Sequence, residues 1–275
     1  MPDPRSPDCF GSRRRKERLQ AGADVNTALP EGETCLMTAT GTGSLRAVKA
    51  LLVRGANINA AEGWRGQTAL MWAAAEGHAS VVDALIESGA DVNARSIAGF
   101  TPLLFAVRQG SAPAVRSLLK ANANVNDIAK AAAISSNSTA RPVSDATSAL
   151  AMAVINAHFE VAGLLVENGA DANAPDARGS ILHTLAWIRK PGAAGGDHAP
   201  PQGTGALDSL GLAEALLKHG ANPNVRIAWQ EIPFDRDDGE VKSPPNIRVG
   251  RDYISLVGAT PFYLAAKNGD VELMR

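Results

Sequence analysis

Four acidic side chains form the densest group of potential metal ligands in the sequence. They are Asp235, Asp237, Asp238 and Glu240. Carboxylate oxygens of this kind are the ligands that Ca²⁺ prefers in proteins. The spacing differs from that of an EF-hand loop, because Gly239 is misplaced and Asn246 stands where the bidentate glutamate belongs. We therefore interpret the group as part of a solvated loop and expect no metal ion and no cofactor.

The other reactive side chains lack the spacing that catalysis requires. The five histidines are scattered, and the sequence has no zinc-type Cys/His cluster, no Walker A motif, no G-x-S-x-G and no H-E-x-x-H. Cys9 and Cys35 form no disulfide framework, and we expect Cys35 to be buried and inert. We therefore expect a protein that is not an enzyme; an active site formed by residues 190–205 and 226–257 is the alternative.

Composition limits the kind of partner. The net charge of −1 argues against nucleic acid as a partner, because phosphate binding needs local positive charge. The run Arg13-Arg14-Arg15-Lys16 is interpreted as a polar capping helix or frayed end, since no aromatic residue supports a nucleic-acid or membrane contact. No run of apolar residues is long enough to span a bilayer, and the first residues form no secretory signal. We expect a cytoplasmic monomer by default, with export left open because the N-terminus can be incomplete.

The elements that would position any site are set by an internal repeat. A tail motif, Gly-Ala-x-x-Asn, begins at Gly22, Gly55, Gly89, Gly169 and Gly220, and Asn122 replaces the glycine in one further copy. The first successive starts lie 33, 34 and 33 residues apart, a spacing typical of stacked helical repeats. The pattern from Gly66 to Ala94 resembles the ankyrin repeat, G-x-T-P-L-H-x-A-A-x-x-G-H-x-x-V-V-x-x-L-L-x-x-G-A-D-V-N-A. The resemblance implies an all-α, ankyrin-repeat α-solenoid of helix-turn-helix pairs with finger loops, interrupted by two or three long loop insertions.

Within each copy the residue types predict two short helices. Thr68 can cap the first helix with its hydroxyl, and Gly77 can end it in a left-handed conformation. Ser44, Ser111 and Asp270 are expected to cap second helices. Each second helix carries an apolar stripe that only stacked neighbours can bury. The stripes are Ala47, Val48, Leu51 and Leu52; Val81, Val82, Leu85 and Ile86; Ala114, Val115, Leu118 and Leu119; Val161, Ala162, Leu165 and Val166; and Leu212, Ala213, Leu216 and Leu217.

Breaks in the repeat register predict the domain organisation. Residues 1–13 are expected to be disordered and residues 14–275 to form one repeat domain. A partial repeat is expected at 14–28, repeats at about 29–61, 62–95, 96–127, 145–175 and 176–225, a truncated repeat at 256–275, and insertions at 127–145, 190–205 and 226–257. The incomplete last copy suggests that the chain continues in its natural form.

The resemblance implies a non-catalytic scaffold that binds a protein partner through the finger loops and the concave face of the first helices. A regulatory or accessory module of a larger exported or enzymatic protein, of which this chain is a fragment, is the alternative. Trp72 and Phe105 are expected in the core, and His183 as a hydrogen-bonding strut of its turn. The register places on the partner-binding surface Trp64, Arg65, Gln67, Glu76, Ile97, Phe100, Arg108, Gln109, Asn156, Trp187, Arg189, Lys267 and Asn268. Trp64, Phe100, Arg108 and Trp187 are the leading candidates, because aromatic and arginine side chains often anchor interfaces; packing between repeats is the alternative for each aromatic residue.

Overall fold

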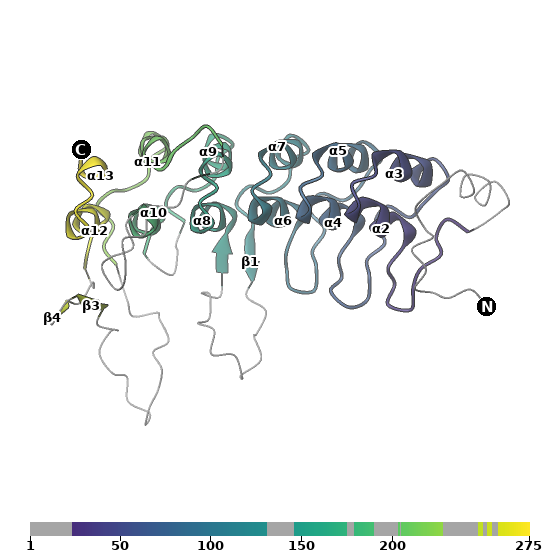
Figure 1. The fold of residues 1–275 in the computed structure, drawn as a ribbon, viewed down its shortest axis with the longest axis horizontal. Helices are drawn as coiled ribbons and strands as arrows, with labels where there is room; N and C mark the ends of the chain where they lie inside the picture. Colours follow the sequence, from purple (N-terminus) through teal and green to yellow (C-terminus); the bar gives the residue numbers. More distant parts are fainter. Residues whose placement is uncertain are drawn as a thin grey trace, which may run out of the picture. The chain divides into compact units, whose positions relative to one another are not determined.

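The computed structural model describes residues 24–130, 146–174, 179–189, 203, 205–227, 247–249, 252–254 and 258–275. The chain divides into two compact units, Met1–Ala132 (unit 1) and Ala133–Arg275 (unit 2). In each unit the described residues form stacked helix pairs, so the all-α prediction is confirmed (Figure 1). The segment expected to be disordered, the acidic group at 235–240 and most of the three insertions lie outside the described residues.

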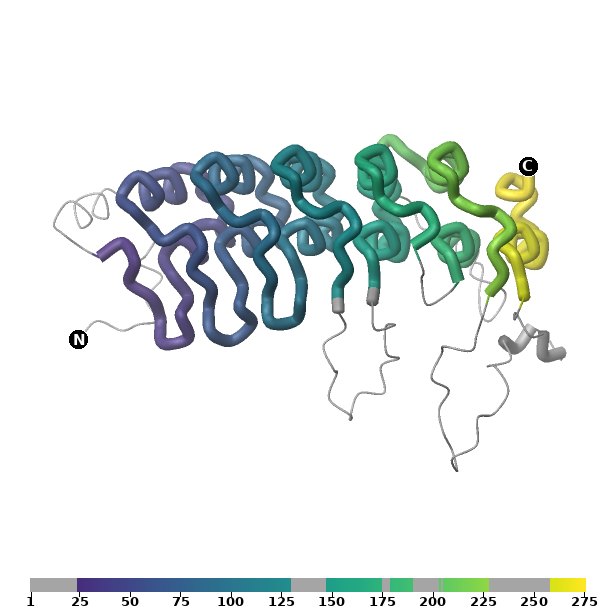
Figure 2. Tube along the Cα trace, turned by 180° about the vertical axis from the view of Figure 1, so that it is seen from behind, coloured from purple at the N-terminus to yellow at the C-terminus, as the bar shows by residue number. Residues whose placement is uncertain are grey.

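Unit 1 contains two layers of helices. The first helices of successive pairs pack on one another, and so do the second helices. Figure 2 shows the loops that lead into the helix pairs as hairpins that lie side by side, and we call these loops fingers. The first finger precedes Cys35, the second lies between Leu52 and Ala69, and the third lies between Glu87 and Pro102. The first layer is α2 (Cys35–Gly41), α4 (Ala69–Ala75) and α6 (Pro102–Gln109); the second is α3 (Leu45–Leu52), α5 (Ala79–Glu87) and α7 (Ala112–Lys120), and the short strand β1 (Ile128–Lys130) follows.

Unit 2 repeats this arrangement. The first helices are α8 (Ala149–Ile155), α10 (Ile181–Arg189) and α12 (Pro261–Lys267), and the second helices are α9 (Phe159–Glu167), α11 (Ser209–Lys218) and α13 (Val271–Met274). Strand β2 (Ala146–Ser148) precedes α8, and β3 (Ile247–Val249) pairs antiparallel with β4 (Asp252–Ile254), with Arg248 opposite Tyr253. Among the helices of the described residues, none is long and apolar enough to cross a membrane.

Four first helices begin with the predicted kind of cap, whereas the hydroxyl of Thr101 makes no capping bond to α6, and the second helices differ again. The hydroxyl of Thr68 accepts a hydrogen bond from the backbone N–H of Met71, and Thr34, Ser148 and Thr260 cap their helices in the same way. The expected caps at Ser44 and Ser111 are wrong, because neither side chain bonds to its own helix. The hydroxyl of Ser111 instead donates across the stack to the carbonyl of Gly77, at 3.4 Å. The longer carboxylate of Asp270 reaches the N–H of Leu273 and does cap α13.

The apolar stripes of the second helices form the core. Val48, Val81 and Leu85 are fully buried, whereas the outer members of several stripes are half-buried. Leu217 is the exception, with 48% of its surface exposed. Its neighbour in the stack, α13, has four residues, so no further turn of helix covers it.

Among the described residues, the asparagines at positions 26, 59, 93 and 173 tie one tail motif to the next. Asn59 donates from Nδ2 to the carbonyl of Gly89 (3.5 Å) and accepts at Oδ1 from the N–H of Asp91 (2.9 Å). In unit 2, Asn173 bonds the carbonyl of Gly220 and the N–H of Asn222 in the same way, at 2.8 and 2.7 Å. One side chain thus satisfies two backbone groups of the adjacent copy, which explains why the motif carries asparagine at this place.

Candidate functional site

Glu62 organises the second finger of unit 1. Its side chain is buried, and its two carboxylate oxygens accept hydrogen bonds from three backbone N–H groups of the finger tip. The donors are the N–H groups of Trp64 (2.7 Å), Arg65 (2.9 Å to each oxygen) and Gln67 (2.9 Å). The backbone of Glu62 also donates to the carbonyl of Gln67 at 3.0 Å. One side chain therefore fixes the tip of the loop from inside.

The environment of Glu62 keeps its carboxylate charged. Burial by itself would raise the pKa, but the N–H bonds from Gln67, Arg65 and Trp64 and the positive charge of Arg65 outweigh it and lower the pKa of Glu62 below its ordinary value. Hydrogen bonds to an ionised acceptor are shorter and stronger than those between neutral groups. At neutral pH the backbone of the finger tip is therefore held by charge-assisted hydrogen bonds.

The third finger has the same architecture with a smaller hub. Ser96 is buried, and its hydroxyl accepts from the backbone N–H of Phe100 at 3.0 Å. Neighbouring fingers are joined through their backbones, because the N–H of Ile97 donates to the carbonyl of Arg65 (2.8 Å) and that of Gly63 donates to Glu31 (2.7 Å). These bonds fix the backbones of neighbouring fingers, and so the starting points of their side chains, relative to one another.

Two large apolar side chains are exposed at these joined tips. Trp64 is 73% exposed and Ile97 is 74% exposed. Gly66 lies beneath Ile97: it adopts φ = +66°, and a Cβ placed on it would stand 3.0 Å from Cγ1 of Ile97. Exposed large apolar groups on a rigid backbone are typical of interaction surfaces.

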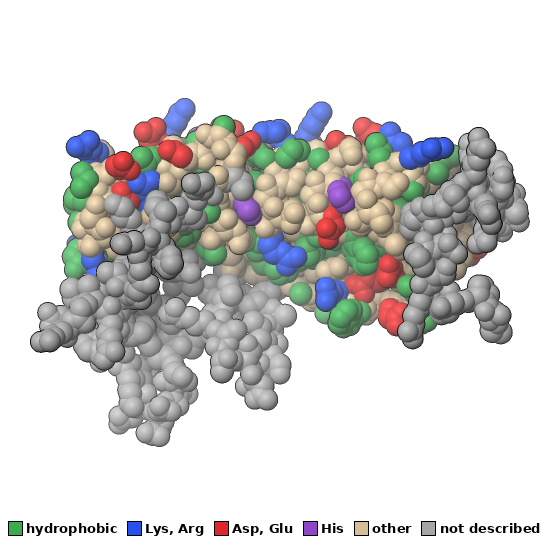
Figure 3. Space-filling model, viewed as in Figure 1, with side chains coloured by type: hydrophobic (Ala, Val, Ile, Leu, Met, Phe, Trp, Pro, Cys, Tyr) green, Lys and Arg blue, Asp and Glu red, His purple; other side chains and the backbone are tan. Residues whose placement is uncertain are grey.

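Arginine side chains lie over the aromatic rings of this region. The guanidinium of Arg65 stands 4.4 Å from the ring centroid of Trp64. The guanidinium of Arg108 lies 5.8 Å from the ring centroid of Phe100 and 5.2 Å from that of Phe105. The centroids of these two rings are 5.4 Å apart. Figure 3 shows hydrophobic, basic and acidic side chains together over the fingers of unit 1. We define the finger surface as Trp64, Arg65, Ile97, Phe100 and Arg108.

The remaining candidates in unit 1 border this surface. Gln67 is half-buried, since its backbone belongs to the Glu62 hub, whereas Glu76 and Gln109 are exposed at the ends of α4 and α6. Phe105 is buried, as predicted. Trp72 is only half-buried and rests on Gly41, so the prediction that it belongs to the core is wrong. Cys35 is likewise half-buried, because it occupies the first turn of α2.

The candidates in unit 2 form no comparable set. Asn156 is exposed, and Trp187 is half-buried against a cluster formed by Ala186, Ile227, Ala259 and Leu264. Asn268 donates to the carbonyl of Ala186 at 3.4 Å, so its amide serves the fold. Lys267 is half-buried, and burial lowers its pKa.

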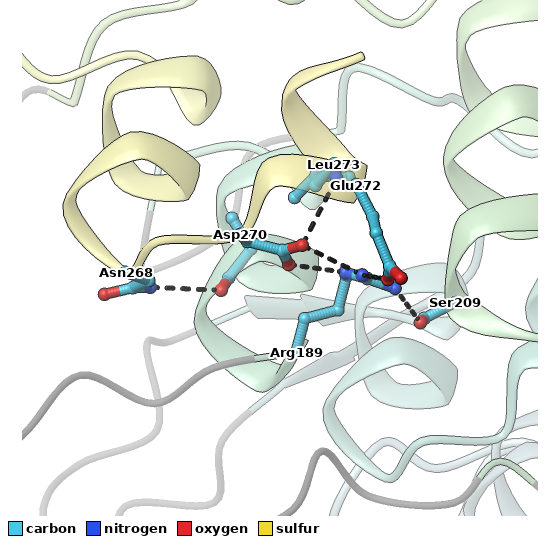
Figure 4. Close-up of polar contacts among 7 residues, drawn as sticks. Arg189, Ser209, Asn268, Asp270, Glu272 and Leu273 are labelled. Carbon is cyan, nitrogen blue, oxygen red and sulfur yellow. Dashed lines mark hydrogen bonds and ion pairs between the residues drawn. The ribbon is translucent and has the colours of Figure 1, made fainter.

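Arg189 lies inside unit 2, which contradicts its expected place on the surface (Figure 4). Its Nε and Nη2 donate to the two oxygens of Asp270, at 2.7 and 3.0 Å, and Nη2 also bonds Glu272 at 3.1 Å. Nη1 donates to the hydroxyl of Ser209 at 2.5 Å. The bonds to Asp270 above all raise the pKa of Arg189. The guanidinium thus joins the end of α10 to the starts of α11 and α13 and is not available to a partner.

His183 is the hydrogen-bonding strut that the sequence predicts. Its Nδ1 accepts from the backbone N–H of Ser180 at 3.1 Å, which leaves the proton on Nε2. Nε2 then donates to the carbonyl of Ala259 at 3.0 Å. The ring is fully buried and serves the fold. Within the described part of the chain, no three His, Cys, Asp or Glu side chains gather as metal ligands would.

Sequence reasoning missed Glu62 and Ser96, which position the finger surface. Both stand three residues after the asparagine that ends the preceding tail motif, Asn59 in one case and Asn93 in the other. This equivalence in register was a usable signal. Their different side chains concealed it, since a glutamate and a serine share only an oxygen acceptor.

The comparisons agree with the repeat architecture. The family model described as ankyrin repeats (3 copies) matches residues 15–96, 59–129 and 95–176. A search of curated proteins found no match to the chain. The family matches overlap and together extend over more than half of the sequence. The chain therefore belongs to the ankyrin-repeat family, whose members generally serve as protein–protein interaction modules.

Proposed function

We propose that this protein is a non-catalytic scaffold that binds a partner protein through the finger surface of unit 1. The single observation that carries the proposal is the exposure of Trp64 and Ile97 on finger tips whose backbones are held by Glu62, by Ser96 and by the finger-to-finger hydrogen bonds. A monomer gains nothing from exposing these groups to water, whereas a partner that covers them gains the hydrophobic contribution.

The hydrogen bonds that hold the finger backbones support the same proposal. Ordering a mobile loop on binding reduces affinity, and a preorganised loop avoids that cost. Arg65 and Arg108 add the residue type that, with tryptophan and tyrosine, most often dominates binding energy at interfaces. Glu76 and Gln109, exposed at the rim, would supply polar contacts around this centre.

A quantitative affinity purification tests the proposal. The wild-type chain and the double variant Trp64→Ala/Ile97→Ser are used as baits in extract of the organism of origin, and the recovered proteins are compared by mass spectrometry. Val53→Ser is the matched control, because Val53 is 88% exposed but follows α3 in the second layer of helices. We expect proteins that wild type and Val53→Ser retain equally and that the double variant loses.

We expect the three baits to have the same melting temperature, because exposed side chains contribute little to stability. Equal melting temperatures ensure that a lost protein reflects the surface and not unfolding of the bait. Equal recovery of all proteins by wild type and the double variant would reject the finger surface as a binding site.

A further inference from the structure

The finger surface exposes its arginines and hides the carboxylates beneath it. The oxygens of Glu62 are occupied by three backbone N–H groups. Asp127, which follows α7, is buried, is paired with Arg95 of the third finger and accepts a hydrogen bond from the N–H of Ile128 at 3.0 Å. These carboxylates therefore offer no exposed oxygen to a partner's cation.

Arg65 presents a guanidinium that is ready for an anionic group. It is exposed and stacked on Trp64, and among the described residues no carboxylate lies within ion-pair distance of it. A guanidinium that stacks by its face keeps the N–H groups of its edge, which match the two oxygens of a carboxylate. Arg108, stacked on Phe100, places a second positive charge on the same surface.

Exposed carboxylates of unit 1 limit where an anion can bind. Asp91, six residues before Ile97, accepts the N–H of Asn93 in the tail of its repeat. Glu31 belongs to the first finger, whose backbone bonds Gly63, and Glu76 ends α4. Negative groups of a partner are thus disfavoured beside the first finger and favoured over the second finger, where Arg65 lies.

We propose that the finger surface recognises a segment of a partner protein in which a large apolar side chain stands beside aspartate or glutamate. The apolar side chain covers Trp64 and Ile97, and the carboxylate lies in the plane of the Arg65 guanidinium. This inference rests on the proposed function and adds the chemistry of the partner.

Selection from a random dodecapeptide library displayed on phage tests it. Wild type, Trp64→Ala/Ile97→Ser, Arg65→Glu and the control Lys49→Gln, whose lysine is exposed on α3, are panned in parallel. Peptides that need Trp64 and Ile97 are expected to be enriched in Asp or Glu next to Leu, Ile, Phe or Trp. Arg65→Glu is expected to lose these peptides, and Lys49→Gln to keep them.

A selected peptide, synthesised with a fluorophore, gives the affinity by fluorescence polarisation. Arg65→Gln should weaken binding about tenfold, as expected for loss of one charge-assisted contact, and added salt should narrow the difference. Peptides that depend on Trp64 and Ile97 but carry no acidic bias, or that bind Arg65→Gln as well as wild type, would overturn this inference and leave the proposed function standing. If no peptide depends on Trp64 and Ile97, both are rejected.

Discussion

Replacing Glu62 by glutamine removes one charge from inside the second finger and changes almost nothing in volume. The carboxylate accepts the N–H groups of Trp64, Arg65 and Gln67 through both oxygens. Glutamine keeps one acceptor oxygen and turns an NH₂ group toward a second donor. At least one of the three N–H groups therefore loses its partner.

The expected loss of stability is about 2–3 kcal/mol. A hydrogen bond to a charged group contributes about 1.5–3 kcal/mol, and a neutral one about 0.5–1.5 kcal/mol. The substitution removes the charge from every hydrogen bond that Glu62 accepts and breaks at least one of them. Water can reach part of the finger tip and bond to the freed N–H group, which reduces the loss of stability. The loss falls on unit 1, because the hub and its donors all belong to it.

The effect must depend on pH with a definite sign. The pKa of Glu62 in the folded protein is lowered from 4.5, so the charged carboxylate stabilises the fold above that ordinary value. This contribution disappears as the pH falls through the lower, folded-state pKa. The difference in unfolding free energy between wild type and Glu62→Gln is therefore full at pH 7 and shrinks below about pH 4.5.

Urea unfolding at pH 7 and at acidic pH measures that difference. Glu31→Gln is the control, because Glu31 is exposed on the first finger and should change the unfolding free energy by less than about 0.5 kcal/mol. Hydrogen exchange gives a local measure, since the amides of Trp64, Arg65 and Gln67 should exchange faster in Glu62→Gln. Unchanged exchange at these amides, or a loss of stability that is the same at both pH values, would refute the role given to Glu62.

Three further predictions test the fold. Leu85→Ala should lower the free energy of unfolding, measured by chemical denaturation, by about 2–5 kcal/mol because Leu85 is fully buried. Leu217→Ala should lower it by less than about 1 kcal/mol, because Leu217 is half exposed. Equal losses would contradict the stacking of α5. Asn173→Ala should lower the free energy of unfolding by about 1–3 kcal/mol, because the carbonyl of Gly220 and the N–H of Asn222 lose their partner. An unchanged melting temperature would argue against the stabilising role of these two bonds. Arg189→Met should lower the free energy of unfolding by about 3–5 kcal/mol, since it leaves the buried carboxylate of Asp270 without its cation. The double variant Arg189→Met/Asp270→Leu should recover part of that loss. A double variant that is less stable than the single one would contradict this account.

The sequence by itself determined the repeat fold. Several copies carry their own capping hydroxyl, their own left-handed residue and their own apolar stripe, so the information is local and recurs along the chain. Thr68, Gly77 and Val81 could be assigned from residue type and spacing alone. The strut at His183 was also predictable, because the resemblance to the ankyrin repeat gives a histidine at this position that role.

Only the tertiary structure decided which side chains of the expected surface remain free for a partner. Register placed Arg65 and Arg189 alike on the outside, but Asp270, 81 residues further on, draws Arg189 into the interior. Glu62 became a hub because the loop folds around it, an outcome set by three backbone donors that residue type does not reveal. Repeat spacing fixes position along a helix pair, whereas exposure depends on long-range partners, and those are known only once the chain has folded.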